Sequence, residues 1–306
     1  MRQSILLLVL ANVLGGLTYP WQKMALRGLP EVTLTVLRSL LGLALMAAWL
    51  AARRGPLWPF ERREAGRLAL LGTAGMAVPL LLGTIGVGLS TAANGSILIL
   101  LEPVAIVLFS RILLGERMGG PRALGLGLGF AGALLVVTEG ATAGPSLLRG
   151  EHLAGNVLLA LSGFLWGLYT PLMKPLAVRH PPVALAFGAT VFGLLLLAPA
   201  ALLESDRWRA GPDLGEALLW TAALGIFSSF LGIVFWTAAL KDLPANAVAP
   251  TVLLQPLVGV AWGVLFLDER LTTQAGVGAV LVAAGVVVGL ARTGPQCPGE
   301  GTPGTR

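Results

Sequence analysis

The chain has 306 residues, of which 56% are hydrophobic and 12% are charged, and its formal net charge is +6. Soluble domains carry about 25% charged residues, so this composition argues against a water-soluble fold. The basic residues are scattered through short loops without interleaved stacking aromatics, a pattern that favours a membrane-surface role over nucleic-acid binding. The composition therefore predicts an integral membrane protein.

Long apolar runs divide the chain from its first residues onward. Arg2 and the run 5–11 resemble a signal peptide, but no small-residue cleavage site follows, so we interpret this stretch as a retained first span. A run of about 20 apolar residues crosses a hydrocarbon core of about 30 Å, and a helix satisfies its backbone there. The sequence predicts an all-α membrane protein with ten transmembrane helices, at residues 4–26, 31–52, 67–88, 91–114, 121–138, 154–176, 182–203, 216–239, 244–267 and 272–291.

Lysine and arginine are distributed unequally between the two sets of loops. With the N-terminus in the cytoplasm, fourteen of the 21 basic residues fall on the inner side, six fall on the outer side and Arg38 lies within a span. Basic residues concentrate in cytoplasmic loops. The count predicts a multi-pass protein of the cytoplasmic (inner) membrane with both termini cytoplasmic.

Two segments occur twice at nearly the same spacing. GLTYPWQKM at 16–24 is followed 151 positions later by GLYTPLMKP at 167–175, and LEP at 101–103 is followed 153 positions later by LQP. Because each copy holds five helices, an odd number, the second copy crosses the membrane in the opposite direction, as in many secondary transporters. We therefore predict two inverted-topology repeats, divided as a first repeat at 1–140, a connecting loop at 141–153, a second repeat at 154–291 and a disordered cytoplasmic tail at 292–306.

The first repeated segment places a proline before a lysine in both copies. Pro20 and Pro171 each remove a backbone hydrogen bond and can kink their helix, one near the outer face and one near the inner face. Lys23 and Lys174 follow at positions from which a long side chain reaches the interface. We predict that these four residues form a pair of gates, one at each face. Ordinary anchoring of helix ends is the alternative for the lysines.

Several motifs resemble those of one family, the ten-helix EamA-type exporters of the drug/metabolite transporter superfamily. The resemblance extends over about residues 4–291 and implies the fold and a transport function, while it specifies the substrate poorly. One departure is Gly15-Gly16, where the family usually has Trp-Gly, so that the aromatic occurs only in the second copy, at Trp166. The motifs are GLTY at 16–19, WGLY at 166–169, LRSLL at 37–41, STAAN at 90–94, LEP at 101–103, LGER at 114–117, LPAN at 243–246, QP at 255–256 and LDER at 267–270.

Two ionisable side chains lie inside the predicted spans and away from their ends. Such residues cost about 2.5–3.5 kcal/mol at the membrane centre and therefore indicate a function. Glu102 is the deepest carboxylate, near the middle of the fourth span, and Arg38 in the second span can reach towards it. Either Glu102 takes up and releases a proton during a transport cycle, or the two residues form a permanent structural ion pair. The repeat-related residue, Gln255, cannot titrate, so coupling through a carboxylate would be one-sided.

Polar and aromatic residues interrupt several spans and are candidates for a mid-membrane pocket. Tyrosine and tryptophan combine apolar surface with a hydrogen-bond donor, which suits an amphipathic metabolite. Plain interhelical packing is the alternative for each residue. The predicted substrate-binding residues are Asn12, Thr18, Tyr19, Arg38, Asn94, Ser96, Trp166, Tyr169, Trp236, Gln255 and Trp262.

The fifth and tenth predicted spans are rich in glycine. Small residues four apart let membrane helices approach closely. Because the two spans hold equivalent places in the repeats, we expect them to pack on each other, with dimerisation between protomers as the alternative use.

The sequence predicts a secondary active transporter that exports a small amphipathic metabolite or amino acid by alternating access, with proton coupling through Glu102 as one mechanism. There is no HExxH, GxSxG or Walker motif, and the single Cys297 forms no CxxC pair, so we expect no enzyme, no cofactor and no metal. The expected partners are a small-molecule substrate, the lipid bilayer and protons, without nucleic acid, for a monomer or weak homodimer. The alternatives are a sugar-phosphate or nucleotide-sugar exchanger, with Lys23 and Lys174 binding phosphate, and a non-transporting membrane scaffold.

Overall fold

The computed structural model describes residues 2–91, 94–95, 98–139, 152–208, 211–266 and 273–290. Within these residues the secondary structure is helical, without a strand. Six helical stretches are long and apolar enough to cross a membrane, namely Arg2–Ala25, Glu31–Ala52, Arg62–Leu89, Leu153–Ala177, Pro182–Leu202 and Leu214–Ala239. The predicted all-α membrane fold is confirmed. The predicted tail at 292–306 and residues 141–151 of the predicted loop lie outside the described residues.

Each repeat consists of long helices together with interrupted ones. The first repeat contains α1 (Arg2–Gly16), α2 (Thr18–Ala25), α3 (Glu31–Ala52), α4 (Arg62–Gly72), the π-helix η1 (Thr73–Ala77), α5 (Val78–Leu89), α7 (Leu101–Leu114) and α8 (Gly120–Glu139). The second contains α9 (Leu153–Ala177), α10 (Pro182–Leu202), the 3₁₀-helix η3 (Ser205–Arg207), α11 (Leu214–Ala223), the π-helix η4 (Leu224–Gly232), α12 (Ile233–Ala239), α13 (Ala245–Val252), α14 (Leu254–Phe266) and α15 (Thr273–Leu290).

The third span begins earlier than the sequence predicted. Its first helix, α4, starts at Arg62 rather than at residue 67, because Glu61 and Glu64 form a capping box in which each carboxylate accepts a hydrogen bond from the other residue's backbone N–H. This reciprocal cap satisfies backbone donors that the first turn would otherwise leave free. Residues 62–66, which the sequence placed outside the third span, therefore belong to the helix.

The two copies use their shared proline differently. The first span is broken at Leu17, between α1 and α2. Pro20 has no N–H to donate to the carbonyl of Gly16, four residues earlier, so the helix is not continued across that point. In the second copy, α9 remains helical throughout, with Pro171 and Pro175 inside it.

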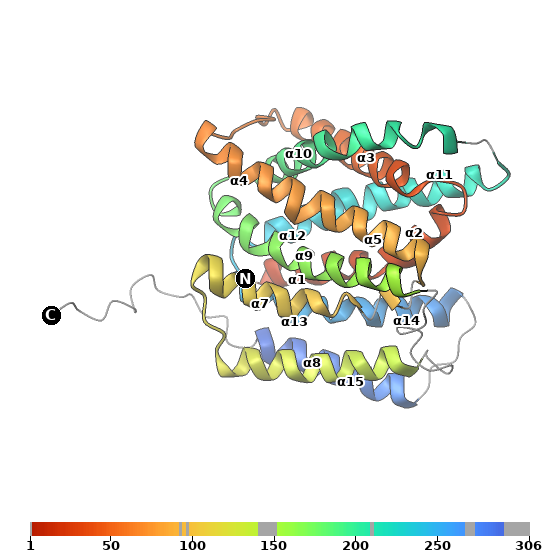
Figure 1. Cartoon of the computed structure of the whole chain (residues 1–306). Coiled ribbons are helices and arrows are strands. Elements are labelled where there is room, and N and C mark those ends of the chain that lie inside the picture. Colours follow the sequence, from red (N-terminus) through yellow and green to blue (C-terminus); the bar gives the residue numbers. More distant parts are fainter. Residues whose placement is uncertain are drawn as a thin grey trace.

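The two repeats run in opposite directions and interlock (Figure 1). α1 begins on the side of the molecule that carries the N-terminus, whereas α9 begins on the opposite side. Helices of the two repeats also pack on each other rather than forming separate bundles: α9 contacts α5 and α7, and α10 contacts α3. The inverted repeat predicted from sequence is the architecture of this fold, and its interior is shared between the copies.

Two repeat-related glycines mark close approaches between the copies. A Cβ atom on Gly16 would lie 2.6 Å from the carbonyl oxygen of Gln255 in α14. A Cβ atom on Gly167 would overlap Ala105 in α7 and lie 2.8 Å from the backbone nitrogen of Ile106. The first helix of each repeat therefore packs, through its glycine, on the fourth span of the other repeat. This contact gives a physical reason for the glycine that begins both copies of the repeated segment.

The glycine-rich helices α8 and α15 lie side by side at one edge of the molecule (Figure 1). A Cβ atom on Gly125 would lie 2.5 Å from the carbonyl oxygen of Gly285, and one on Gly132 would lie 2.6 Å from that of Gly278. The expected packing of these two helices on each other is confirmed.

The outer surface is strongly apolar. Large aliphatic side chains such as Leu195, Leu202 and Val280 are about two-thirds exposed, at 67%, 66% and 69%. Soluble monomers rarely expose apolar patches on this scale. These side chains face outward because the surrounding medium is lipid.

Candidate functional site

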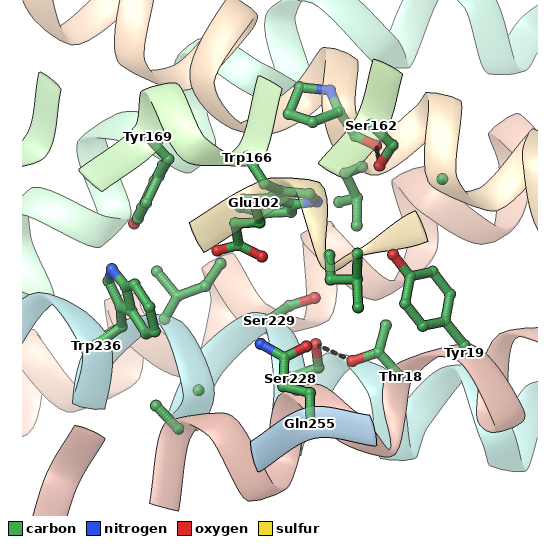
Figure 2. Close-up of a pocket in the computed structure, with 18 of the residues that line it drawn as sticks. Thr18, Tyr19, Glu102, Ser162, Trp166, Tyr169, Ser228, Ser229, Trp236 and Gln255 are labelled. Atoms are coloured by element: carbon green, nitrogen blue, oxygen red, sulfur yellow. Dashed lines mark hydrogen bonds between the residues drawn. The ribbon is translucent and has the colours of Figure 1, made fainter. Parts of the chain in front are cut away.

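A cavity opens at the centre of the helix assembly, between the two repeats (Figure 2). It encloses about 870 Å³ of empty space, including the part that opens to the outside. The polar and aromatic residues that line it are Thr18, Tyr19, Gln22, Arg38, Glu102, Ser162, Trp166, Tyr169, Ser228, Ser229, Trp236 and Gln255.

Two broken helices bring Glu102 and Gln255 to the cavity. Glu102 is the second residue of α7, and Gln255 is the second residue of α14. Pro103 has no N–H for the carbonyl of Ile99, so the turn is closed instead by the Glu102 N–H, which donates to that carbonyl at 2.9 Å. Glu102 lies near the middle of the predicted span 91–114, but this span is not one continuous helix, because it is interrupted just before Glu102.

Arg38 reaches the cavity from α3 and is almost completely buried, with 1% exposure. Its Nε donates to Ser229 Oγ at 3.0 Å and its Nη2 donates to Ser228 Oγ at 2.7 Å. Its Nη1 has no hydrogen-bond partner among the described residues. The guanidinium thus donates to two neutral hydroxyls, and its Nη1 can donate to a further acceptor.

Arg38 and Glu102 line the same cavity without forming an ion pair in the described part of the chain. The permanent structural ion pair considered from the sequence is therefore not present. Figure 2 shows the Glu102 carboxylate pointing into the cavity, opposite Ser229, Ser228 and Gln255. The Glu102 side chain is 7% exposed and accepts no hydrogen bond within the described residues.

The serines that hold Arg38 come from η4, a π-helical segment. Gly42 on α3 permits the contact, since a Cβ atom there would lie 2.9 Å from the Cβ of Ser229. The π-helix η1 in the first repeat begins at Thr73, 151 positions before Leu224 where η4 begins. π-turns occur frequently at functional sites, and here the equivalent span of each repeat carries one.

Sequence reasoning missed four polar residues of the cavity wall. Gln22 donates from Nε2 to Thr84 Oγ1 at 2.9 Å, which leaves its Oε1 without a partner among the described residues. Ser162 donates to the carbonyl of Pro79 at 2.7 Å. The other two are Ser228 and Ser229. Their only signal in the sequence is a pair of hydroxyls inside an apolar run, and that pattern does not distinguish a cavity-facing serine from one bonded to its own helix.

Aromatic rings line two sides of the cavity. In Figure 2, Tyr169 and Trp236 lie on one side of Glu102 and Tyr19 lies on the other. The rings of Trp166 and Tyr169 meet edge to face with their centroids 5.7 Å apart, and Trp236 Nε1 donates to Thr170 Oγ1 at 3.1 Å. These contacts hold the rings in place and leave apolar surface facing the cavity.

Three predicted pocket residues lie outside the cavity lining. Asn12 does not line the cavity, but its Oδ1 accepts a hydrogen bond from Gln255 Nε2 at 3.1 Å and so orients a residue that does. Asn94 donates to Ser90 Oγ at 2.9 Å. Trp262 stacks edge-on with Trp21, at a centroid distance of 6.1 Å.

Two further predicted pocket residues are Thr18 and Ser96. Thr18 lies at the cavity wall, where its hydroxyl shares a hydrogen bond of 3.1 Å with Ser228. Ser96 lies outside the described residues.

The two lysines lie outside the cavity lining, at equivalent places. Lys23 Nζ donates to the carbonyls of Val87 and Ser90, both at 2.8 Å, at the end of α5. Lys174 Nζ donates to the carbonyls of Leu240, at 2.5 Å, and Lys241, at 3.4 Å, just after α12. Each lysine caps the C-terminal end of the third span of its own repeat, where a cation interacts favourably with the helix dipole.

The fold and the cavity together define a class of protein: a helical membrane protein of two inverted repeats around a central cavity, which is the architecture of many secondary transporters. Residues 2–138 and 153–290 match the EamA-like transporter family. This chain belongs to that family, as the motifs of its sequence indicated.

Several of its relatives are named as transporters or exporters, not as enzymes. An uncharacterized transporter of Archaeoglobus fulgidus is 29% identical, with 94% of this chain and 97% of the relative aligned. A probable terminal-alkyne amino-acid exporter of Streptantibioticus cattleyicolor is 26% identical, with 100% and 99% aligned. A solved crystal structure with 21% identity superposes with a TM-score of 0.79 over 96% of this chain and 98% of that one, which supports the fold.

Proposed function

We propose that this transporter is a secondary active exporter of a small amphipathic metabolite or an amino acid, coupled to protons through Glu102. The observation that carries the proposal is the position of Glu102, a buried carboxylate without a protein partner in the described chain, at a helix break in a cavity walled by both repeats. A carboxylate in such a place can exchange a proton with the solution whenever the cavity opens.

The substrate class rests on the lining and on one relative. Rings of Tyr19, Trp166, Tyr169 and Trp236 provide apolar surface beside the charged and amide groups, as an amphipathic molecule requires. The similarity to a protein named as an amino-acid exporter favours amino acids. The sugar-phosphate alternative gains no support, because Lys23 and Lys174 donate to main-chain carbonyls outside the cavity lining.

The experiment is transport by purified protein reconstituted in liposomes. Radiolabelled amino acids should cross the membrane only when the protein is present, and an imposed proton gradient should accelerate the movement. A gradient that leaves the rate unchanged, with transport otherwise intact, would contradict proton coupling. Absence of movement for a broad set of amino acids and amphipathic metabolites would contradict the proposed function.

We further propose that Pro20 and Lys23 form a gate at the outer face and that Pro171 and Lys174 form one at the inner face, with both termini cytoplasmic. The mirrored lysine caps support this proposal, as does the excess of basic residues predicted on the inner side. Inverted repeats can exchange conformations and so open the cavity to one face at a time.

The gates can be tested by accessibility labelling. In a Cys297→Ser background, a cavity cysteine introduced as Ser162→Cys should react faster from the outside when Lys23→Met is added, and faster from the inside when Lys174→Met is added. Losing a charge-assisted hydrogen bond should raise each rate by about tenfold. Equal effects of both variants at both faces would assign the lysines to helix anchoring alone.

A further inference from the structure

The cavity wall carries a basic and an acidic side chain that do not pair with each other. Arg38 and Glu102 are both buried in its wall, and neither makes an ion pair within the described residues. A buried charge without a counter-charge is strongly unfavourable unless another group supplies one. Each of these two side chains therefore lacks a partner that a ligand in the cavity could provide.

Arg38 is oriented for an anion. Its Nε and Nη2 are bonded to Ser229 and Ser228, which hold the planar guanidinium by two hydrogen bonds. Its Nη1 is buried, lacks a partner among the described residues, and belongs to a side chain that lines the cavity. Guanidinium nitrogens match carboxylate oxygens in geometry and charge.

The acceptors of the same wall suit an ammonium group. Glu102 presents a carboxylate whose oxygens point into the cavity (Figure 2). Gln22 presents a buried Oε1 without a partner in the described chain, and its orientation is set by the Nε2 bond to Thr84. An ammonium has three N–H donors and no acceptor, so it complements two such oxygens.

We propose that the cavity selects zwitterions, with Arg38 binding the carboxylate of the substrate, Glu102 binding its ammonium group and Gln22 accepting a further hydrogen bond. The inference rests on the proposed function and narrows its substrate class. A simple cation would leave Arg38 without a counter-charge, and a simple anion would leave Glu102 without one. A zwitterion satisfies both and adds no net charge to a site inside the membrane.

The side chain of the zwitterion is apolar. Beyond the charged, hydroxyl and amide groups the wall consists of Tyr19, Trp166, Tyr169 and Trp236 together with aliphatic residues. Among the described lining residues Arg38 is the only basic one. An aromatic or branched aliphatic side chain would contact these rings without burying further polar atoms. The expected substrates are amino acids and close analogues with such side chains.

The test measures binding to the purified full-length protein with matched ligands. L-phenylalanine is compared with its methyl ester, which lacks the carboxylate charge, and with 3-phenylpropanoate, which lacks the ammonium. The same three forms of L-leucine supply a second side chain. At least one zwitterion should bind about tenfold or more tightly than either of its singly charged analogues.

Arg38→Gln supplies the residue-level test, because glutamine can still donate to a serine. It should weaken binding of the zwitterion by about tenfold or more and leave binding of the methyl ester nearly unchanged, since the ester already lacks the group that Arg38 contacts. Arg38→Lys keeps the charge and should retain the preference for the zwitterion over the ester. Arg111→Gln, an exposed arginine on α7, is the control for loss of a positive charge.

Other results would overturn the inference. Equal affinity for a zwitterion and its singly charged analogues would contradict it, and so would the absence of binding by both zwitterions. It would also be contradicted if Arg38→Gln weakened binding of the zwitterion and of the methyl ester by the same factor. Transport in liposomes that does not discriminate among the three forms would reject zwitterion selection and leave the proposed export function standing. If the zwitterions bind selectively but are not transported, the proposed export function is rejected and zwitterion selection stands.

Discussion

Glu102→Gln is expected to abolish the acceleration of transport by a proton gradient. Because it also removes the carboxylate proposed to bind the substrate's ammonium group, the remaining equilibration of substrate should require a higher substrate concentration. A gradient of one pH unit represents about 1.4 kcal/mol per proton and supports about tenfold accumulation if one proton moves per substrate. Glutamine cannot carry the proton, so this accumulation should be lost. The measurement is uptake of a radiolabelled substrate into liposomes with and without the gradient.

The substitution should be tolerated by the fold. The equivalent position of the second repeat already holds a glutamine, Gln255, as the second residue of α14. Glu216→Gln provides a matched control, because it makes the same chemical change on an exposed side chain at the start of α11. Full gradient-driven accumulation by Glu102→Gln would show that the carboxylate does not couple transport to protons.

Gly132→Leu is expected to lower the free energy of unfolding by about 1–3 kcal/mol or more, the range for overpacked interiors. A Cβ atom at Gly132 would lie 2.6 Å from the carbonyl oxygen of Gly278 and 2.7 Å from the nitrogen of Val282, so α8 and α15 must separate. Backbone atoms cannot move aside as the end of a flexible side chain can. The measurement is the thermal unfolding temperature of purified protein in detergent.

The same helix offers a control of the same chemistry. Gly127 on α8 is exposed and would place its Cβ atom in open space. Gly127→Leu should therefore not lower the free energy of unfolding, because leucine favours a helix more than glycine does. Equal destabilisation by the two variants would mean that the contact between α8 and α15 does not determine the effect.

Several features of this protein follow from its sequence alone. Apolar runs long enough to cross a membrane predict the helical membrane fold, because a chain in lipid must satisfy its backbone within helices. Five spans in each copy predict the inversion of the second repeat. The glycines of the fifth and tenth spans predict that these helices pack together, since equivalent helices with matching small residues can approach closely.

The sequence also located Glu102 and Arg38 as charges within spans, and the cavity contains both. It could not say whether they pair, because pairing depends on where Ser228 and Ser229 lie relative to the guanidinium. That position follows from the tertiary approach of η4 to α3.

Only the tertiary structure decided which polar residues face the cavity. Asn12, Asn94 and Trp262 interrupt apolar runs just as Gln22 and Ser162 do, yet the first three lie off the cavity and the last two line it. The direction of a side chain depends on how its helix is rotated against its neighbours. A π-turn inserts an extra residue into a turn, and a break such as those before α7 and α14 restarts the helix, so either device rotates all the residues that follow. Composition and periodicity record the presence of such residues, while the packing of the two repeats determines where they point.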